Sequence, residues 1–135
     1  MRFKIHPGRF ALCQLPAGRK PPDWVFTGGF HSVTVTPEEV SIICEQEAAP
    51  EGVKMQRDYI LLGLEGPFDF NAIGILQSFL TPLAQVRIPI FAVSTYNTDF
   101  VLVHEEFEQR ALDALKRGGY ELVAAQIPLT TKVTK

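Results

Sequence analysis

The amino-acid sequence predicts an α+β fold that consists of two ferredoxin-like βαββαβ halves, the first with a truncated helix. Three observations support this prediction. Short runs alternate between apolar and polar residues, as strands with one buried face do. Two stretches of the second half repeat apolar residues at helical spacing. The resulting order in that half, strand, helix, strand, strand, helix, strand, is the split βαβ arrangement.

We expect three segments: a truncated N-terminal half over residues 1–55, a complete C-terminal half over 56–127 and a frayed tail over 128–135. The boundary is placed within 48–55, because this stretch contains Pro50-Glu51-Gly52, a run of turn-forming residues. With 135 residues, the chain is long enough for one compact unit or for two small halves that share a core.

The first half has three short strands and little helix. One strand is expected at 9–15, and two more are expected to form a hairpin at 30–35 and 40–45, where apolar and polar residues alternate. Asp23 can begin a helix, but Gly28-Gly29 ends it after about one turn. This half is therefore expected to lack most of one helix.

The second half combines strands with two full helices. The helices are expected at about 71–86 and 105–116, where apolar residues recur three and four positions apart. Acidic residues early in the second helix and Lys116-Arg117 late in it complement the helix dipole. The strands are expected at 59–64, 88–95, 99–103 and 120–123.

Composition and charge argue against several classes of partner. Because the formal net charge is −2, the chain has no basic field to neutralise phosphates, and neither nucleic acid nor an anionic membrane surface is expected as a partner. No strand carries the basic, aromatic-rich signature of RNA-recognition modules, which share the split βαβ plan. The sequence has no apolar signal segment and no run of roughly 18 apolar residues, so we expect a cytoplasmic protein that does not span a membrane.

The residue types that catalysis and metal binding need do not occur at recognised spacings. The candidates are His6, His31, His104, Cys13 and Cys44, besides scattered carboxylates. Both cysteines fall in apolar, strand-like runs and are expected to be buried thiols. His104 is expected to end a strand and to cap the helix that follows. We therefore expect no enzyme, no metal site and no cofactor.

Two polar segments flank the first helix of the second half, and they form the candidate binding site. The segment 66–75 leads into that helix, whose free backbone N–H groups and positive dipole end attract a carboxylate. The hairpin tip 94–99 places small polar side chains and one carboxylate within six residues. Each segment can also be explained as local structure, the first as a helix cap and the second as a polar turn.

These segments belong to a longer stretch that resembles the signature of small ACT-domain proteins. The stretch consists of residues 74–76, 82–84 and 88–103. The similarity continues upstream through Trp24 and residues 32–42, and it covers roughly residues 9–123. The plan of each half is also similar to the paired ACT units of cytosolic arginine sensors.

The resemblance implies a non-catalytic regulatory fold in which two ACT units pack side by side and hold an amino acid between them. Arginine sensors have an acidic residue near the helix start where this chain has Ala72, a difference that argues against arginine as the ligand. Together with Ser94 from the hairpin tip, the candidate ligand-binding residues are Ala72, Ile73, Gly74, Ile75, Leu76, Ser94, Thr95, Tyr96, Thr98 and Asp99.

Charge complementarity indicates how an amino acid would bind. Its carboxylate would meet the backbone N–H groups of residues 73–75, and its ammonium would meet Asp99 and the hydroxyls of Ser94 and Thr95. A homodimer is expected, because ACT units usually complete their sites or sheets by association. The alternative is a domain that dimerises or binds other proteins without a small ligand, since ferredoxin-like folds host many functions.

Overall fold

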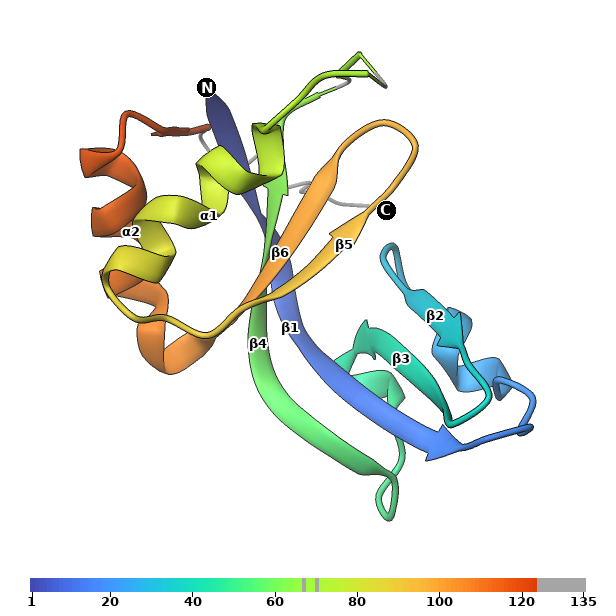
Figure 1. The fold of residues 1–135 in the computed structure, drawn as a ribbon. Helices are drawn as coiled ribbons and strands as arrows, with labels where there is room; N and C mark the ends of the chain where they lie inside the picture. Colours follow the sequence, from blue (N-terminus) through green and yellow to red (C-terminus); the bar gives the residue numbers. More distant parts are fainter. Residues whose placement is uncertain (67, 70, 124–135) are drawn as a thin grey trace, which may run out of the picture. The chain divides into compact units, whose positions relative to one another are not determined.

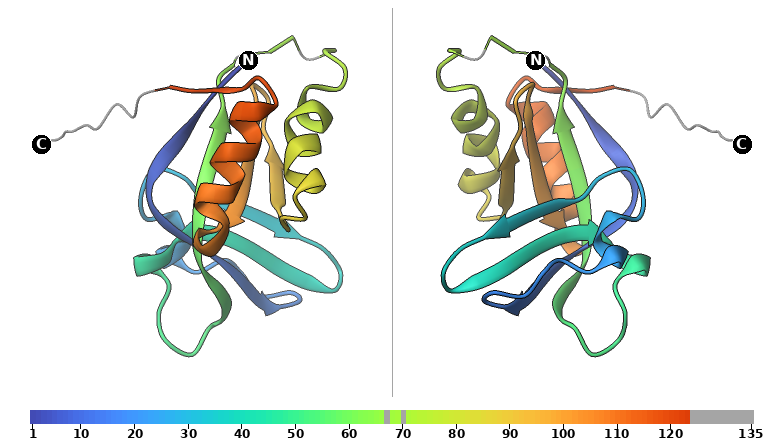
Figure 2. Two further views of the ribbon diagram at one scale, coloured as in Figure 1. Left: turned by 90° about the vertical axis from the view of Figure 1, so that its left-hand side faces the viewer. Right: turned by 90° about the vertical axis from the view of Figure 1, so that its right-hand side faces the viewer.

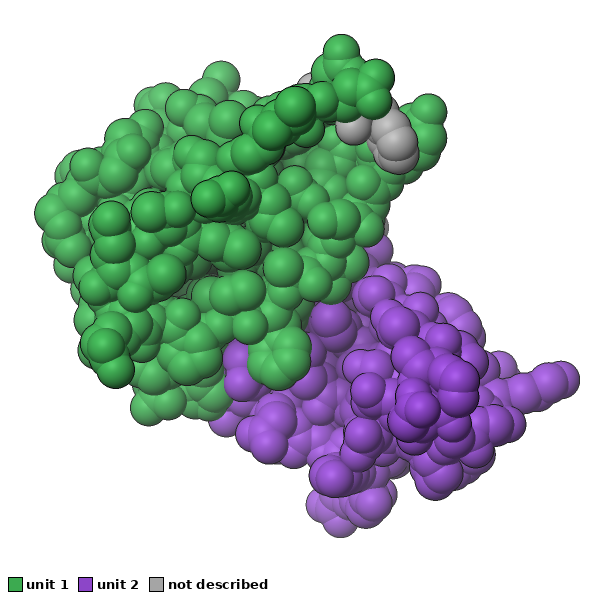
Figure 3. Space-filling view, in the orientation of Figure 1, with its two compact units in different colours: residues 1–7, 60–135 green, residues 8–59 purple. Residues whose placement is uncertain are grey.

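A computed structural model describes residues 1–66, 68–69 and 71–123. The chain divides into two compact units (Figure 3): unit 1 comprises residues 1–7 and those from 60 onward, and unit 2 comprises residues 8–59. Two long strands, β1 (Arg2–Pro16) and β4 (Lys54–Leu64), contribute residues to both units. The boundary expected between residues 55 and 56 falls inside β4, and the tail expected over 128–135 lies outside the described residues.

Unit 1 is a sheet with two helices on one face (Figures 1 and 2). The helices are α1 (Ile75–Gln85) and α2 (Glu108–Arg117), and the turn η3 (Glu105–Phe107) precedes α2. The strands lie in the order β7-β1-β4-β6-β5, in which β5 is Phe91–Ser94, β6 is Asp99–His104 and β7 is Glu121–Leu122. From β4 onward the elements follow the order expected for the second half of the chain.

The core of unit 1 lies between the sheet and the two helices. Residues four positions apart on one helix face supply the helical side of this core, and alternate residues of β4 supply the other side. Phe79 of α1 packs edge-on against Phe3 and Tyr120, with ring centroids 5.6 and 5.2 Å apart. The buried members are Phe3, Ile60, Leu62, Leu64, Phe79, Leu83, Ile88, Val101, Val103, Ala111, Leu115 and Tyr120.

The first strand starts at Arg2, seven residues before the expected strand at 9–15. Its first residues lie between β4 and β7, where Arg2 and Phe3 pair in parallel with Glu121 and Leu122. Phe3 is 1% exposed and belongs to the core. The alternation that predicts a strand is present here, but charged residues and Pro7-Gly8 obscured it.

Helix α1 begins four residues later than expected. The backbone carbonyl of Asp69 accepts the N–H of Ala72 (2.9 Å), and Asp69 Oδ1 accepts the N–H of Asn71 (2.9 Å). These hydrogen bonds form a turn that competes with a helix. Gly74 then takes the left-handed φ of +78°, and the N–H of Ser78 donates to its carbonyl (2.9 Å). The prediction of a helix over 71–86 is therefore wrong at its first turn.

Unit 2 is an antiparallel sheet that is covered by short turns. Strand β3 (Glu39–Glu45) pairs with β1 on one side and with β2 (Ser32–Val35) on the other, which confirms the expected hairpin. The turn η1 (Asp23–Phe26) brings Val25 onto the core, where it is fully buried. The buried members of this core are Ala11, Cys13, Leu15, Val25, Val40, Ile42 and Cys44.

The first half was expected to lack most of one helix, but the structure has only short turns in place of both helices. After the hairpin, where the complete βαββαβ plan has its second helix, the structure has only η2 (Gln46–Ala48), a single turn. Residues 8–59 are all described, and they contain no α-helix. The run Ala48-Ala49-Pro50 explains this, because proline removes a donor and biases the preceding residue away from helix.

Candidate functional site

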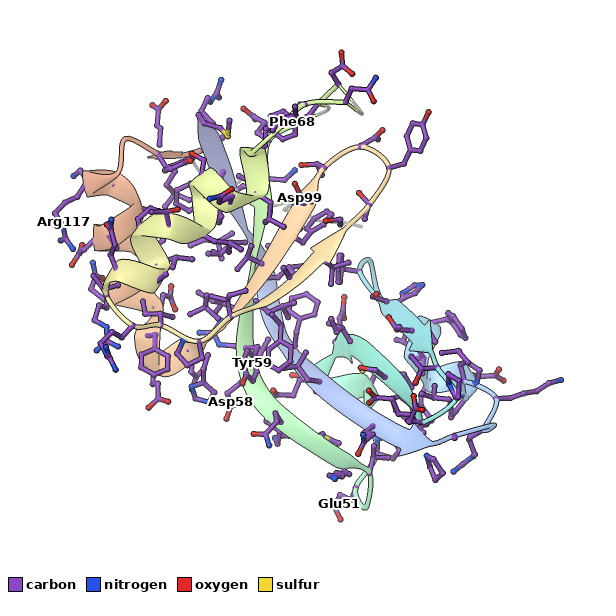
Figure 4. All side chains as sticks on the ribbon, in the orientation of Figure 1. Glu51, Asp58, Tyr59, Phe68, Asp99 and Arg117 are labelled. Carbon is purple, nitrogen blue, oxygen red and sulfur yellow. The ribbon has the colours of Figure 1, made fainter. Side chains whose placement is uncertain are left out.

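A pocket of about 400 Å³ opens in unit 1 between the start of α1 and the tip of the β5–β6 hairpin. Figure 4 labels Phe68 on the loop before α1 and Asp99 at the start of β6, which belong to the two segments that line it. The lining residues are Phe68, Asp69, Ala72, Gly74, Ile75, Leu76, Gln77, Ser94, Thr95, Tyr96, Asn97, Thr98 and Asp99.

The structure brings together all but one of the residues that were expected to bind a ligand. Only Ile73 stays outside the pocket lining, and its side chain is 95% exposed. Four lining residues were not among those candidates: Phe68, Asp69, Gln77 and Asn97. Asp69 and Asn97 lie within the two polar segments that the sequence points to, whereas Gln77 becomes part of the first helical turn only because α1 begins late.

The hairpin tip is held by its own hydrogen bonds. The backbone N–H of Thr95 donates to the carbonyl of Thr98 (2.8 Å), and the N–H of Thr98 donates to the hydroxyl of Thr95 (3.3 Å). Ser94 Oγ donates to Asp99 Oδ1 across the end of the hairpin (2.5 Å). These bonds fix the Asp99 carboxylate beside the Ser94 hydroxyl at one wall of the pocket.

Three contacts fasten the hairpin tip to the segment that leads into α1. Thr98 Oγ1 donates to the carbonyl of Leu64 (2.9 Å), and the N–H of Phe68 donates to the carbonyl of Asn97 (3.0 Å). A Cβ at Gly66 would lie 3.0 Å from the Asn97 carbonyl oxygen, closer than ordinary van der Waals contact, so glycine favours this close approach. The pocket therefore has a defined shape although both segments are loops.

The start of α1 lies at the pocket. Gly74 is the N-cap residue, and it has no side chain that could cap the helix. The first backbone N–H groups of the helix belong to Ile75, Leu76 and Gln77, which all line the pocket. The backbone N–H groups at the helix start were expected to be those of residues 73–75. Because the helix starts after Gly74, they are those of Ile75, Leu76 and Gln77 instead.

The charged side chains of the pocket lining are both carboxylates. Asp69 and Asp99 are its only ionised side chains among the described residues, and the helix start adds partial positive charge. Each carboxylate accepts one hydrogen bond through Oδ1, Asp69 from the N–H of Asn71 and Asp99 from Ser94 Oγ, and of the two only Asp99 lies on the hairpin tip. The arrangement can hold a small zwitterion, with its anionic end at the helix and its cationic end at the hairpin.

The histidines and cysteines lie outside this pocket. His104 Nδ1 accepts the backbone N–H of Glu106 (3.2 Å), which confirms the expected cap. Cys13 and Cys44 are buried free thiols, as expected. Across the part of the chain that the structure describes, no group of three or more His, Cys, Asp or Glu side chains is arranged to hold a metal ion, and no helix is long and apolar enough to cross a membrane.

Comparison with protein families identifies the class. Residues 54–117 match the model of the ACT domain, and residues 8–52 match a separate model of an N-terminal domain. The chain therefore contains an ACT domain over residues 54–117.

Two solved structures are similar to this chain over most of its length. The chain is 34% identical to the Agobacterium tumefaciens protein Atu0741, whose crystal structure superposes with a TM-score of 0.86 over 90% of this chain and 91% of that one. The regulatory subunit of aspartate kinase from Thermus flavus shares the fold, with a TM-score of 0.61 over 87% of this chain and 96% of that one at 13% identity.

Two curated relatives are similar over a part of their length. The bovine cytosolic arginine sensor for mTORC1 subunit 1 is 31% identical over 88 residues, which are 57% of this chain and 27% of that protein. The human protein CASTOR3P is 37% identical over 87 residues, which are 55% of this chain and 53% of that protein. The chain thus spans about a quarter and about half of the length of these two relatives.

Proposed function

We propose that this chain is a non-catalytic regulatory module that binds an amino acid or a similar zwitterion in the pocket at the start of α1. The observation that supports this proposal most strongly is the pairing of opposite charge in one pocket. Ile75, Leu76 and Gln77, whose backbone N–H groups are the first of α1, line it together with Asp99.

In this proposal each end of the ligand meets its complement. The ligand carboxylate accepts hydrogen bonds from the first N–H groups of α1, where the helix dipole adds favourable charge. The ligand ammonium donates to Asp99 and to the hydroxyls of Ser94 and Thr95. A hydrogen bond to a charged group contributes about 1.5–3 kcal/mol, so these contacts matter more than the apolar ones in an open pocket.

The lining also suggests which amino acids bind poorly. With two carboxylates and no cationic side chain among its described residues, the pocket should repel the side chains of aspartate and glutamate. Neutral amino acids avoid this repulsion. We therefore expect acidic amino acids to bind more weakly than neutral ones of similar size.

The assembly is part of the same proposal. We expect a homodimer in which ACT units pair, and we interpret unit 2 as a truncated ACT unit with short turns in place of helices. Several groups of the pocket are exposed in one copy of the chain, among them Tyr96 at 82% exposure, so a second copy could complete the walls. Light scattering that gives the mass of one chain at all concentrations from micromolar to millimolar would contradict the homodimer.

The first experiment is a thermal-shift screen of the twenty amino acids. A ligand at 100 times its dissociation constant stabilises the folded state by about 2.7 kcal/mol, a readily measured rise in melting temperature. We expect a rise for at least one neutral amino acid and a smaller one, or none, for aspartate and glutamate. If none of the twenty raises the melting temperature, the binding proposal fails.

Asp99→Asn then tests the site with the amino acid found in the screen. Removing the carboxylate charge should weaken binding by about 10- to 150-fold, which corresponds to about 1.5–3 kcal/mol, in titration calorimetry. Asp113→Asn is the matched control, because Asp113 is also an aspartate of unit 1 with one side-chain partner, Gln109 at 2.9 Å. Unchanged affinity in Asp99→Asn would remove Asp99 from the site. Lower stability without lower affinity would mean that Asp99 only braces the turn.

A second candidate function is a ligand-free interaction domain. The exposed apolar side chains of Ile73 and Tyr96, on the two segments that form the pocket, favour this alternative. It predicts self-association that amino acids do not change and that Ile73→Ser with Tyr96→Ser weakens. Association that depends on an amino acid would favour the regulatory module instead.

A further inference from the structure

Unit 2 places its two cysteines together in its core. Cys13 lies on β1 and Cys44 on β3, and they are 3% and 0% exposed. In the antiparallel register Cys13 pairs with Ile42, and Ala11 pairs with Cys44. Residues two apart on a strand share a face, so the two thiols occupy diagonal positions on the same side of the sheet. Both belong to one hydrophobic cluster.

The two thiols interact with each other and differ in chemistry. Both side chains lie on one face of the sheet within one hydrophobic cluster, close enough for each thiol to affect the pKa of the other. Hydrogen bonding with Cys44 lowers the pKa of Cys13 from its ordinary value, although burial opposes this effect. The pKa of Cys44 is raised, first by the same hydrogen bond and then by burial. Cys13 is therefore the thiol that ionises first, and the thiolate is the nucleophilic form.

We propose that Cys13 and Cys44 form a reversible intramolecular disulfide when the chain is oxidised by a peroxide. The proposal is independent of the amino-acid pocket, because both thiols lie in unit 2 and the pocket lies in unit 1.

The reaction balances in two steps. The Cys13 thiolate attacks one oxygen of hydrogen peroxide, the O–O bond breaks, and hydroxide leaves a sulfenic acid on Cys13. The Cys44 sulfur then attacks the Cys13 sulfur, the S–O bond breaks, and the leaving oxygen takes up protons as water. Overall, two thiols lose two electrons and two protons, and one hydrogen peroxide becomes two waters.

The position of the pair favours reversal by a thiol reductant. Diagonal neighbours in an antiparallel sheet are farther apart than directly opposite residues, so a bond between them pulls on the β1–β3 ladder. Strained disulfides are reduced more easily than relaxed ones. We therefore expect dithiothreitol to restore both thiols without unfolding the protein.

The test is the mass of the native protein after exposure to hydrogen peroxide, followed by alkylation in denaturant. We expect a loss of about 2 Da per chain, no alkylated cysteine, and return of both thiols after reduction. Two alkylated thiols after exposure to peroxide would overturn the proposal. So would addition of about 16 or 32 Da without a crosslink, or a disulfide between two chains.

Single serine variants test the assigned roles, since a serine hydroxyl can still donate a hydrogen bond. In Cys44→Ser the remaining Cys13 should stop at sulfenic acid, a gain of about 16 Da that dimedone traps. In Cys13→Ser the buried Cys44 should stay a thiol at the same peroxide dose. Equal reactivity of the two variants would contradict the roles, and the wild-type mass decides the crosslink even if a variant folds poorly.

Discussion

The two units differ in what covers the apolar face of their strands. In unit 1 two α-helices cover that face, and large residues such as Phe79 and Leu83 fill the space between. In unit 2 a single 3₁₀ turn brings Val25 onto a smaller cluster that includes both thiols. Both units contain a hairpin of similar design.

This difference decides what each unit can do. A helix of eleven residues beside a hairpin tip gives unit 1 a helix start and a carboxylate in one pocket. Unit 2 has the hairpin but no α-helix, so it cannot offer a helix dipole to an anion. The proposed zwitterion site therefore depends on the helix, and not on the sheet that the two units have in common.

The largest expected effect comes from Phe79→Ala in the core of unit 1, which should lower the free energy of unfolding by about 3–5 kcal/mol. Urea unfolding can be followed with two signals, because both helices lie in unit 1 and the single tryptophan, Trp24, lies in unit 2. Helical circular dichroism reports the first unit and tryptophan fluorescence the second.

We expect both signals to shift together in Phe79→Ala, since β1 and β4 contribute to both units. A fluorescence transition that stays at the wild-type midpoint would show that unit 2 unfolds independently of unit 1.

Gly74→Ala and Gly52→Ala should each cost about 1–2 kcal/mol of stability. Both glycines have a left-handed φ, +78° and +90°, and a Cβ at either position would meet no atom within 4 Å, so the cost is backbone strain alone. Only Gly74 lines the pocket of unit 1. The ligand-induced thermal shift should therefore decrease in Gly74→Ala and persist in Gly52→Ala. An equal decrease in both variants would disconnect the pocket from ligand binding.

Acid should destabilise unit 1 through His6. Its Nε2 atom is buried without a hydrogen-bond partner among the described residues, next to Gly63 and the ring of Phe100 at 5.6 Å. Burial, and then the positive charge of Lys4, lowers the pKa of His6 in the folded state below its ordinary value of 6.5.

Since the unfolded chain then binds the proton more tightly, the stability is fully present above about pH 6.5 and is lost as the pH falls from there toward the folded pKa. The melting temperature of the wild type should fall over this range more than that of His6→Gln. Parallel curves for the two proteins would contradict the assignment.

The smallest effects should come from the two hairpin turns. Thr36 Oγ1 accepts the N–H groups of Glu38 (3.2 Å) and Glu39 (3.1 Å) in unit 2, whereas Thr95 Oγ1 accepts the N–H of Thr98 alone in unit 1. We expect Thr36→Ala to cost about 1 kcal/mol and Thr95→Ala about 0.5 kcal/mol, from chemical unfolding. A larger cost for Thr95→Ala would mean that the tip in unit 1 is the more strongly braced of the two.

The candidate site was largely predictable from the sequence, but its assembly was not. Two polar segments next to a helix pattern indicated residues around Gly74 and Asp99, and the pocket contains most of them. Nothing local predicts that Thr98 bonds to the Leu64 carbonyl, or that Gly66 admits the hairpin tip, because these contacts join residues about thirty positions apart. Such contacts depend on strand order, which periodicity does not specify.

By itself the sequence determined where the hairpins lie, that two helices follow in the second half, and that both thiols are buried, because these features depend on local periodicity and turn chemistry. Tertiary structure decided the rest. Arg2–Pro16 is a strand from its first residue because Phe3 enters a core built mainly by residues far along the chain. Cys13 meets Cys44 because the register of β1 and β3 places them diagonally. A pairing between distant strands satisfies backbone groups that no local pattern can assign, and this is why only the folded chain reveals it.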